Sequence, residues 1–192
     1  MDAADRLREL LLTPGEAAAL DAPGRTDAAV LVPLYLDAGE LHAVFTKRRG
    51  DLRRHAGEIS FPGGRQERAD EDLRLTALRE AEEEIGLPPA AVDLVGALPP
   101  TGTFVTSFRV HPFVGVIEPG RAWTPQPSEV EEVLELSLSA LVRGFEMKRL
   151  IRHGLPIRTP SYTVDANLIW GATARIVQSL LERLRPLLTS DL

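Results

Sequence analysis

The sequence predicts an α/β domain in which a mixed β-sheet is flanked by helices. Strand-like runs outnumber helical ones, and they come before, between and after the helical segments, which is typical of a sheet covered on both faces. The chain has 192 residues and no cysteine. This length is enough for one domain to bury its own core without disulfides or structural metals. We therefore expect a single layered domain.

The helices are predicted from apolar residues at helical spacing and from stop signals that follow them. The helix with the clearest end is followed by Gly86, which suits a left-handed position, and then by Pro88-Pro89. A shorter helical piece is expected near Ser139–Val142, directly after a strand. The other expected helices are a short amphipathic helix over Asp2–Leu12, a second helical piece over Glu16–Leu20, a helix over Asp72–Ile85 and a final amphipathic helix over Asn167–Leu184.

The strands are predicted from runs rich in Val, Leu, Ile and Phe that are separated by turn residues. Two of these runs meet at Ala38-Gly39 and predict a hairpin, and residues 144–165 predict a second hairpin late in the chain. The expected strand regions are 28–37, 40–48, 57–61, 92–100, 107–120 and 129–138, together with the late hairpin.

Composition excludes several classes of protein. The net charge is −6, so no basic field favours nucleic acid or an anionic membrane as a partner. The absence of cysteine excludes thiolate catalysis and Cys-ligated zinc. The N-terminal sequence mixes acidic and basic residues and does not resemble a signal peptide, and no apolar run approaches the roughly 20 residues of a membrane helix. We expect a cytoplasmic protein.

The stretch from Gly57 to Leu87 organises the rest of the chain. It joins a glycine turn, Phe-Pro-Gly-Gly, to a helix with a concentrated acidic face. At about 100° per residue, Glu80, Glu83 and Glu84 share one exposed arc of this helix. The opposite side carries a buried stripe of small and aliphatic residues, namely Ala77, Leu78, Ala81 and Ile85.

This acidic face conflicts with two rules of helix stability. Like charges three and four residues apart repel each other by a few tenths of a kcal/mol, and Glu82–Glu84 lie in the last turn, where the helix dipole disfavours anions. A solvated acidic face is one interpretation. The other is a hard divalent cation, because Mg²⁺ and Mn²⁺ prefer oxygen ligands and also bind phosphate. Zinc fits less well, because the chain has no Cys and few His.

The segment GGRQERADEDLRLTALREAEEEIGL resembles the Nudix box, G-x5-E-x7-R-E-U-x-E-E-x-G-U, where U is a bulky aliphatic residue. The second half matches at Arg79-Glu80, Glu83-Glu84 and Gly86-Leu87, with Ala81 at the first aliphatic position. The first half departs from it. The spacing from Gly64 to Arg79 is one residue longer than usual, and the loop acid is either Asp70 or Glu71.

The preceding segment, FTKRRGDLRRHAGEISFPGGR, resembles the motif of the coenzyme A diphosphatase (CoA pyrophosphatase) branch of the Nudix hydrolases. The matching residues are Thr46, Arg48, Arg53, Gly57 and Phe61-Pro62-Gly63-Gly64. Arg49 stands where the branch usually has a small residue. The extra residue in the box also occurs in this branch, so the irregular spacing favours the narrower assignment.

This resemblance implies a Nudix-type α/β/α sandwich over residues 27–186, preceded by an N-terminal helical extension over residues 1–26. It also implies a metal-dependent hydrolase, with Mg²⁺ or Mn²⁺, that cleaves the diphosphate of coenzyme A to 3′,5′-ADP and 4′-phosphopantetheine. The same chemistry on ADP-ribose, NADH or a nucleoside triphosphate is an alternative, and so is a non-catalytic nucleotide sensor. The charge balance disfavours a nucleic-acid processor.

The resemblance also suggests roles for residues of the acidic helix and beyond. Glu80 and Glu84 are expected to be the principal metal ligands, with Gly64 beside them and Glu83 as a third ligand or the general base. Glu129 is the rival base or an additional ligand. Arg79 is expected to orient the glutamates through charge-assisted hydrogen bonds.

Arginines are the candidates for the substrate's phosphates, because a guanidinium binds phosphate with two parallel hydrogen bonds. We expect Arg48, Arg53 and Arg54 to serve in this way, including at a 3′-phosphate, and Gly63 to let the backbone approach the substrate. A basic loop that only aids solubility is the alternative.

Overall fold

The computed structural model describes residues 3–51, 57–67, 72–103, 107–152 and 155–188. Its elements, in chain order, are α1 (Ala3–Leu10), α2 (Pro14–Ala18), β1 (Thr26–Asp37), β2 (Glu40–Arg48), β3 (Ile59–Ser60), β4 (Gly63–Arg65), α3 (Leu73–Ile85), a 3₁₀ turn (Pro89–Ala91), β5 (Asp93–Ala97), β6 (Thr101–Gly102), β7 (Phe108–Val116), β8 (Val130–Ser137), α4 (Leu138–Arg143), β9 (Phe145–Arg152), β10 (Leu155–Val164), β11 (Asn167–Ile169) and α5 (Gly171–Leu188).

The long strand β1 is the centre of a mixed sheet. It runs parallel to β7 over Thr26–Leu34, and its other edge is shared between two antiparallel partners, β4 at Ala28–Val30 and β2 at Leu34–Asp37. The strand order is β3-β2-β1-β7-β5, with β8 paired to β2 and β6 paired to β7. The expected mixed sheet is therefore confirmed.

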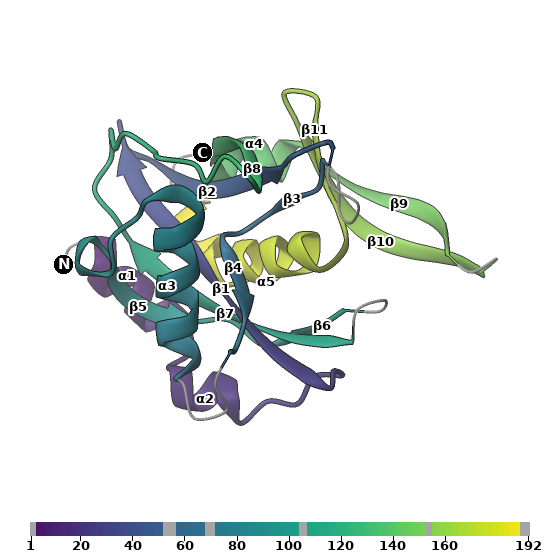
Figure 1. The fold of residues 1–192 in the computed structure, drawn as a ribbon, viewed down its shortest axis with the longest axis horizontal. Helices are drawn as coiled ribbons and strands as arrows, with labels where there is room; N and C mark the ends of the chain where they lie inside the picture. The colour runs from purple at the N-terminus through teal and green to yellow at the C-terminus, as the bar shows by residue number, and fades with distance from the viewer. Residues whose placement is uncertain (1–2, 52–56, 68–71, 104–106, 153–154, 189–192) are drawn as a thin grey trace.

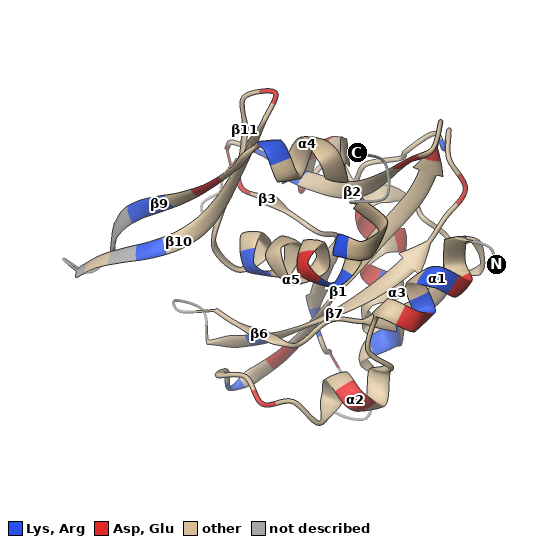
Figure 2. Ribbon diagram, turned by 180° about the vertical axis from the view of Figure 1, so that it is seen from behind, with Lys and Arg blue, Asp and Glu red and all other residues tan. Residues whose placement is uncertain are grey.

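Helices cover both faces of this sheet, as Figures 1 and 2 show, with α3 on one face and α5 on the other. The core divides accordingly into two clusters. One joins α3 to the sheet through Ala77, Ala81 and Ile85, which have no exposed surface. The other joins α5 and α1 to the opposite face and includes Leu7 and Leu180. The predicted α/β/α sandwich is observed.

A smaller antiparallel sheet of β9, β10 and β11 extends from the body (Figure 1). The expected late hairpin is confirmed as β9 and β10. The prediction that the final helix begins at Asn167 is wrong, because Asn167–Ile169 pairs with β10 as a strand and the helix begins at Gly171. Leu168 is consequently exposed, not packed as expected.

A two-residue turn explains this difference. Asp165 and Ala166 both have positive φ, at 48° and 65°, and Val164 pairs directly with Asn167. Positive φ at both central residues defines the turn that matches the twist of a hairpin, and Asn-Gly is its usual sequence signal. Ala38 and Gly39 form the same kind of turn between β1 and β2, where glycine made it predictable.

Among the described residues, no helix is both long and apolar enough to cross a membrane.

The end of α3 provides a test of this architecture. Gly86 has φ of 69°, and a Cβ there would lie 2.9 Å from the Cβ of Thr124. The left-handed conformation alone costs a residue with a Cβ about 1–2 kcal/mol. We expect Gly86→Ala to lower the free energy of unfolding, measured with urea, by about 2 kcal/mol or more, because the steric contact adds to that cost. Gly120→Ala is the control, since Gly120 has φ of 71° but no atom near its missing side chain. Equal losses in the two variants would contradict the contact with Thr124.

Candidate active site

Local sequence holds α3 at both ends and against the sheet. The Asp72 side chain accepts a hydrogen bond from the backbone N–H of Arg74 (2.9 Å), which is a helix N-cap. At the other end the Gly86 N–H donates to carbonyls of the last turn. Because the buried stripe is built of alanines, the helix lies close to β1 and β4. The predicted helix is confirmed, with Asp72 as its cap.

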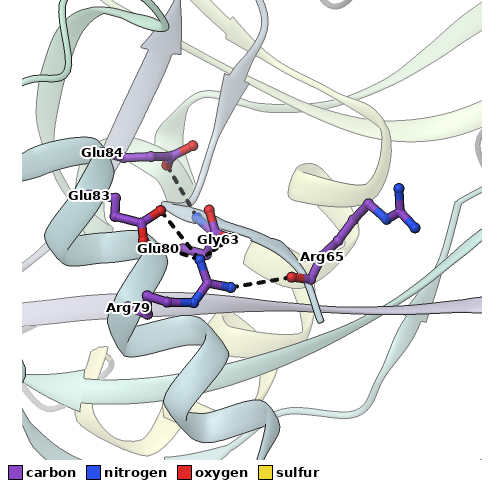
Figure 3. A network of polar contacts seen from close by, with 6 residues as sticks. All are labelled: Gly63, Arg65, Arg79, Glu80, Glu83 and Glu84. Carbon is purple, nitrogen blue, oxygen red and sulfur yellow. Dashed lines mark hydrogen bonds and ion pairs between the residues drawn. The ribbon is translucent and has the colours of Figure 1, made fainter. Parts of the chain in front are cut away.

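Glu84 is the buried carboxylate of this helix. Its exposed fraction is 8%, and one carboxylate oxygen accepts a hydrogen bond from the backbone N–H of Gly63 (3.2 Å; Figure 3). The expectation that Glu84 lies on an exposed arc is therefore wrong, because β4 covers this part of the helix. Burial raises the pKa of Glu84 to about 8, against the opposing effect of the Gly63 N–H, and the nearby Glu80 carboxylate adds to the rise.

Glu80 and Glu83 are joined to Arg79. The Arg79 guanidinium donates to Glu80 (2.9 Å) and to both oxygens of Glu83 (3.3 Å), and its other terminal nitrogen reaches the Arg65 carbonyl (3.5 Å; Figure 3). Glu80 is mostly covered, whereas the Glu83 side chain is 58% exposed. Desolvation raises the pKa of Glu80 as well, opposed by Arg79. This geometry matches the orienting contact expected of Arg79.

Gly63 and Gly64 lie in strand β4, so the expected glycine turn is instead an extended segment paired with β1. Both positions carry glycine because neighbouring atoms lie too close to leave room for a Cβ. A Cβ on Gly63 would lie 2.4 Å from the Ala29 carbonyl oxygen, and one on Gly64 would lie 2.4–2.5 Å from the Glu80 carboxylate. The preceding Phe61 is buried and stacks on Phe45 at 4.4 Å, which fixes the strand in place.

Arg48 and Glu129 form the opposite side of the site. Arg48 ends β2 and its guanidinium lies 3.6 Å from a carboxylate oxygen of Glu129, in the turn before β8. Both side chains influence the Glu84 carboxyl, because Arg48 favours its charged form and Glu129 disfavours it. The Arg48 Nε is buried and has no hydrogen-bond partner in the described part of the chain. An unpaired buried donor next to carboxylates suits an anionic ligand.

The structure thus brings together most of the predicted site residues from distant parts of the chain. Glu80, Glu83, Glu84 and Arg79 come from α3, Gly63 and Gly64 from β4, Arg48 from β2 and Glu129 from the turn before β8. Arg53 and Arg54, and the loop acids Asp70 and Glu71, lie outside the described residues. The catalytic, metal-binding and substrate-binding roles of all these residues stay predictions.

The donor set fits Mg²⁺ or Mn²⁺ in its chemistry. A buried carboxylate on Glu84 lies near two further carboxylates, on Glu80 and Glu129, and the Arg48 guanidinium supplies one opposing charge. A hard divalent cation would favour the ionised form of the buried Glu84 and relieve its repulsion from Glu80 and Glu129. The side chains as they stand do not form a ready cage, since the described residues contain no group of three His, Asp or Glu placed to hold a metal ion. Glu80 and Glu83 turn to Arg79 instead.

Two contacts of the site were not predictable from the motif. The backbone N–H of Gln126 donates to the Glu84 carbonyl (2.8 Å), and the N–H of Thr124 donates to the Ile85 carbonyl (3.1 Å), so the segment before Glu129 is fastened to the end of α3. Trp123 donates its indole N–H to Glu135 (2.7 Å) and packs partly on the core. Trp170 precedes α5, whereas the helix expected over Asn167–Leu184 would have included it.

The two glycines of β4 make a matched pair for a test. We expect Gly63→Ala to lower the free energy of unfolding by about 2–3 kcal/mol, because its Cβ meets backbone that cannot move aside. Gly64→Ala meets the end of the flexible Glu80 side chain, so its stability should change by less than about 1 kcal/mol while Mn²⁺ affinity falls about ten-fold. Urea unfolding and isothermal titration of Mn²⁺ measure the two quantities. If Gly64→Ala bound Mn²⁺ with unchanged affinity, Glu80 would not be a metal ligand.

The buried Glu84 carboxyl predicts a pH-dependent stability in metal-free protein. Its pKa is about 8 in the folded protein against 4.5 ordinarily, so the folded state holds this proton over a pH range in which the unfolded chain has lost it. The contribution of Glu84 to stability is complete below pH 4.5 and is lost as the pH rises through about 8. The loss is on the order of 4 kcal/mol.

We therefore expect Glu84→Gln to be more stable than wild type at pH 8.5 in EDTA and to lose less stability than wild type between pH 5 and pH 8.5. Urea unfolding at the two pH values measures this. Glu82→Gln is the control, because it removes an exposed carboxylate from the same turn of the helix. Excess Mn²⁺ should restore the stability of wild type at pH 8.5 and leave Glu84→Gln unchanged. A wild-type protein that Mn²⁺ does not stabilise would contradict the metal site.

Comparison with known proteins agrees with this geometry. The NUDIX domain family matches residues 25–153 of the chain. A relative from Cronobacter sakazakii, named uncharacterized Nudix hydrolase NudL, is 39% identical over 155 residues, which cover 80% of each chain.

Solved structures agree on the fold. A MutT/nudix family protein from Enterococcus faecalis aligns with a TM-score of 0.58 at 14% identity, over 97% of this chain and 75% of its own. The Nudix domain of Shewanella oneidensis NrtR, solved with ADP ribose, aligns with a TM-score of 0.55 at 18% identity, over 98% of this chain and all of its own. Nudix hydrolases act on phosphorus-containing anhydrides and generally use Mg²⁺ or Mn²⁺. With the family match over residues 25–153, the relative at 39% identity and the helix of the box in place, the chain belongs to the Nudix hydrolase family.

Proposed function

We propose that this hydrolase cleaves the diphosphate of coenzyme A or of its derivatives, with Mg²⁺ or Mn²⁺, to 3′,5′-ADP and 4′-phosphopantetheine. The segment from Thr46 to Gly64 carries the proposal, because it resembles the coenzyme A diphosphatase motif within the Nudix family. The proposal covers the substrate, the metal and the roles of the individual residues.

The position of Arg48 supports it. This arginine of the motif ends β2 beside Glu84 and Glu129, and its Nε is buried without a partner among the described residues. A guanidinium next to a carboxylate cluster is placed to bind a phosphate whose negative charge would otherwise be repelled. Arg53, eleven residues before Gly64 in the motif, would meet the 3′-phosphate.

The chain's own residues would divide the work as follows. Glu80 and Glu84 would hold the cation, with Gly64 next to them. Arg79 would fix Glu80 and Glu83 in orientation through the hydrogen bonds it makes with both. Glu83 or Glu129 would accept the proton of the attacking water. Neutralisation of the diphosphate and activation of water are what Mg²⁺ or Mn²⁺ supplies when bound.

The need for this arrangement follows from the substrate's charge. A diphosphate is polyanionic and water is a poor nucleophile, so hydrolysis depends on neutralising charge and on placing water in line with the bond that breaks. The buried carboxylate of Glu84 cannot do this alone, because it repels phosphate. A divalent cation held by Glu84, together with Arg48, would neutralise the charge of the diphosphate.

A panel of substrates tests the proposal. Purified protein with Mn²⁺ is incubated separately with coenzyme A, ADP-ribose, NADH and nucleoside triphosphates, and the products are separated by chromatography. We expect 3′,5′-ADP to be released from coenzyme A faster than any product from the other compounds. Rapid turnover of another compound without release of 3′,5′-ADP would reject coenzyme A as the substrate and leave the Nudix chemistry in place.

The same assay separates an enzyme from a nucleotide sensor. Glu84→Gln should lower kcat/KM about a hundred-fold or more, because the neutral amide is a poor ligand for a hard cation. Glu82→Gln, from the same helical turn, is the matched control and should keep wild-type activity. Tight binding of a panel compound with no turnover by wild type would favour the sensor.

A further inference from the structure

Arg49 is the residue at which this chain departs from the coenzyme A motif, and its side chain is fully engaged by the protein. Its Nε and one terminal nitrogen donate to the two oxygens of Asp51 (2.9 and 2.7 Å), and its other terminal nitrogen donates to the carbonyl of Pro127 (2.7 Å). A guanidinium used in this way does not point its fork at a phosphate. Arg49 instead connects the end of β2 to the segment before β8.

That segment is a tight turn that carries Glu129. The N–H groups of Glu129 and Val130 both donate to the Gln126 carbonyl (3.0 and 2.9 Å), and the Arg49 N–H donates to the Glu129 carbonyl (3.0 Å). The Gln126 N–H in turn donates to the Glu84 carbonyl on α3. The turn therefore connects α3 to the end of β2, and the Arg49 side chain binds it at the Pro127 carbonyl.

Directly after this turn, the pairing of β8 with β2 contains a β-bulge. Lys47 pairs with Glu132 and Arg48 pairs with Val130, so Glu131 has no opposite residue in β2. Its side chain accepts a hydrogen bond from the Gly50 N–H (3.2 Å). Bulges of this kind re-aim neighbouring side chains and are common next to active sites. Here the bulge and the Arg49 contacts fix the turn, and Glu129 meets Arg48 at 3.6 Å.

We propose that Arg49 is a positioning residue, which locks the Glu129 turn to the end of β2 and so sets the Glu129 carboxylate beside Arg48 and Glu84. The proposal rests on the proposed function in one respect, namely that Glu129 takes part in the reaction as base or ligand. The Arg49–Asp51 pair is exposed, with side-chain exposures of 42% and 66%, so it contributes little to stability. Its effect is on the geometry of one carboxylate.

Arginine is required for this arrangement. Its planar fork can bind both oxygens of Asp51 along one edge and still donate to Pro127 from the remaining nitrogen. A lysine has one nitrogen and cannot hold both partners in these directions. The small residue that is usual at this position in the coenzyme A branch would reach neither of them.

A double-mutant cycle tests the proposal. The four proteins are wild type, Arg49→Ala, Glu129→Gln and the double variant, compared by kcat/KM on the substrate that the panel identifies. We expect Arg49→Ala to lower kcat/KM about ten-fold in wild type, mainly through kcat, and less than about two-fold in the Glu129→Gln background, because residues that act through one another are not additive. Arg49→Lys should resemble Arg49→Ala.

Arg74→Ala is the matched control. Arg74 is also exposed and also pairs with an aspartate two residues away, Asp72, but it lies at the other end of α3. The Arg74→Ala variant should keep the wild-type kcat/KM, and Glu129→Gln should have the same effect on kcat/KM in this variant as in wild type. Amide hydrogen exchange gives a readout that does not depend on activity. The N–H groups of Glu129 and Val130 should exchange faster in Arg49→Ala and at the wild-type rate in Arg74→Ala.

The outcomes separate this proposal from the proposed function. If another compound replaces coenzyme A as the substrate, the cycle is measured on that compound. If no panel compound is hydrolysed, Mn²⁺ affinity is measured in the same four proteins in place of kcat/KM. Equal effects of Arg49→Ala in both backgrounds, or unchanged exchange at Glu129 and Val130, would overturn the role of Arg49.

Discussion

The close approach of α3 to β4 is the contact on which the candidate site depends. It requires alanines on the inner face of the helix and glycines on the strand, because any side chain at Gly63 or Gly64 would collide with β1 or with Glu80. The result is a glutamate whose carboxylate is covered and hydrogen-bonded to a strand N–H. A carboxylate in such a place carries a desolvation cost, which the hydrogen bond from Gly63 and the positive charge of Arg48 partly offset.

The positive and negative charges around Glu84 are unevenly paired. Arg79 pairs with Glu80 and Glu83, whereas Arg48 pairs with the exposed Glu129 and is also the positive charge that favours the ionised form of the buried Glu84. Nudix hydrolases generally use divalent cations, and the proposed site for such a cation in this chain lies among these carboxylates, which outnumber the arginines beside them. If a cation binds there as proposed, metal affinity and the stability of the protein at alkaline pH are linked through Glu84.

The side of the candidate site that faces α3, formed by the end of β2 and the turn with Glu129, is stabilised by backbone hydrogen bonds as much as by side-chain contacts. The turn that carries Glu129 is fastened to α3 through Gln126 and to β2 through Arg49, and the bulge at Glu131 ends the regular pairing of β8 there. Residues about forty positions beyond the end of the box thereby become part of the candidate site. The departure from the family motif at Arg49 is part of this fastening.

The mixed sheet and the box helix, with its cap and its glycine end, could be predicted from the sequence alone, because periodicity, capping and motif spacing are local properties. The same local motifs supplied the candidate site residues, whose roles stay predictions. The sequence did not determine which glutamate is buried, since helical geometry places Glu80, Glu83 and Glu84 on one arc and only β4 distinguishes them. It missed β11, because Asp165-Ala166 forms a hairpin turn without the usual glycine. It also left Arg49 as an unexplained departure, because Pro127 is distant in the chain. The pairing of distant segments follows only from the folded structure, because burial and hydrogen bonding depend on residues that are neighbours in space and not along the chain.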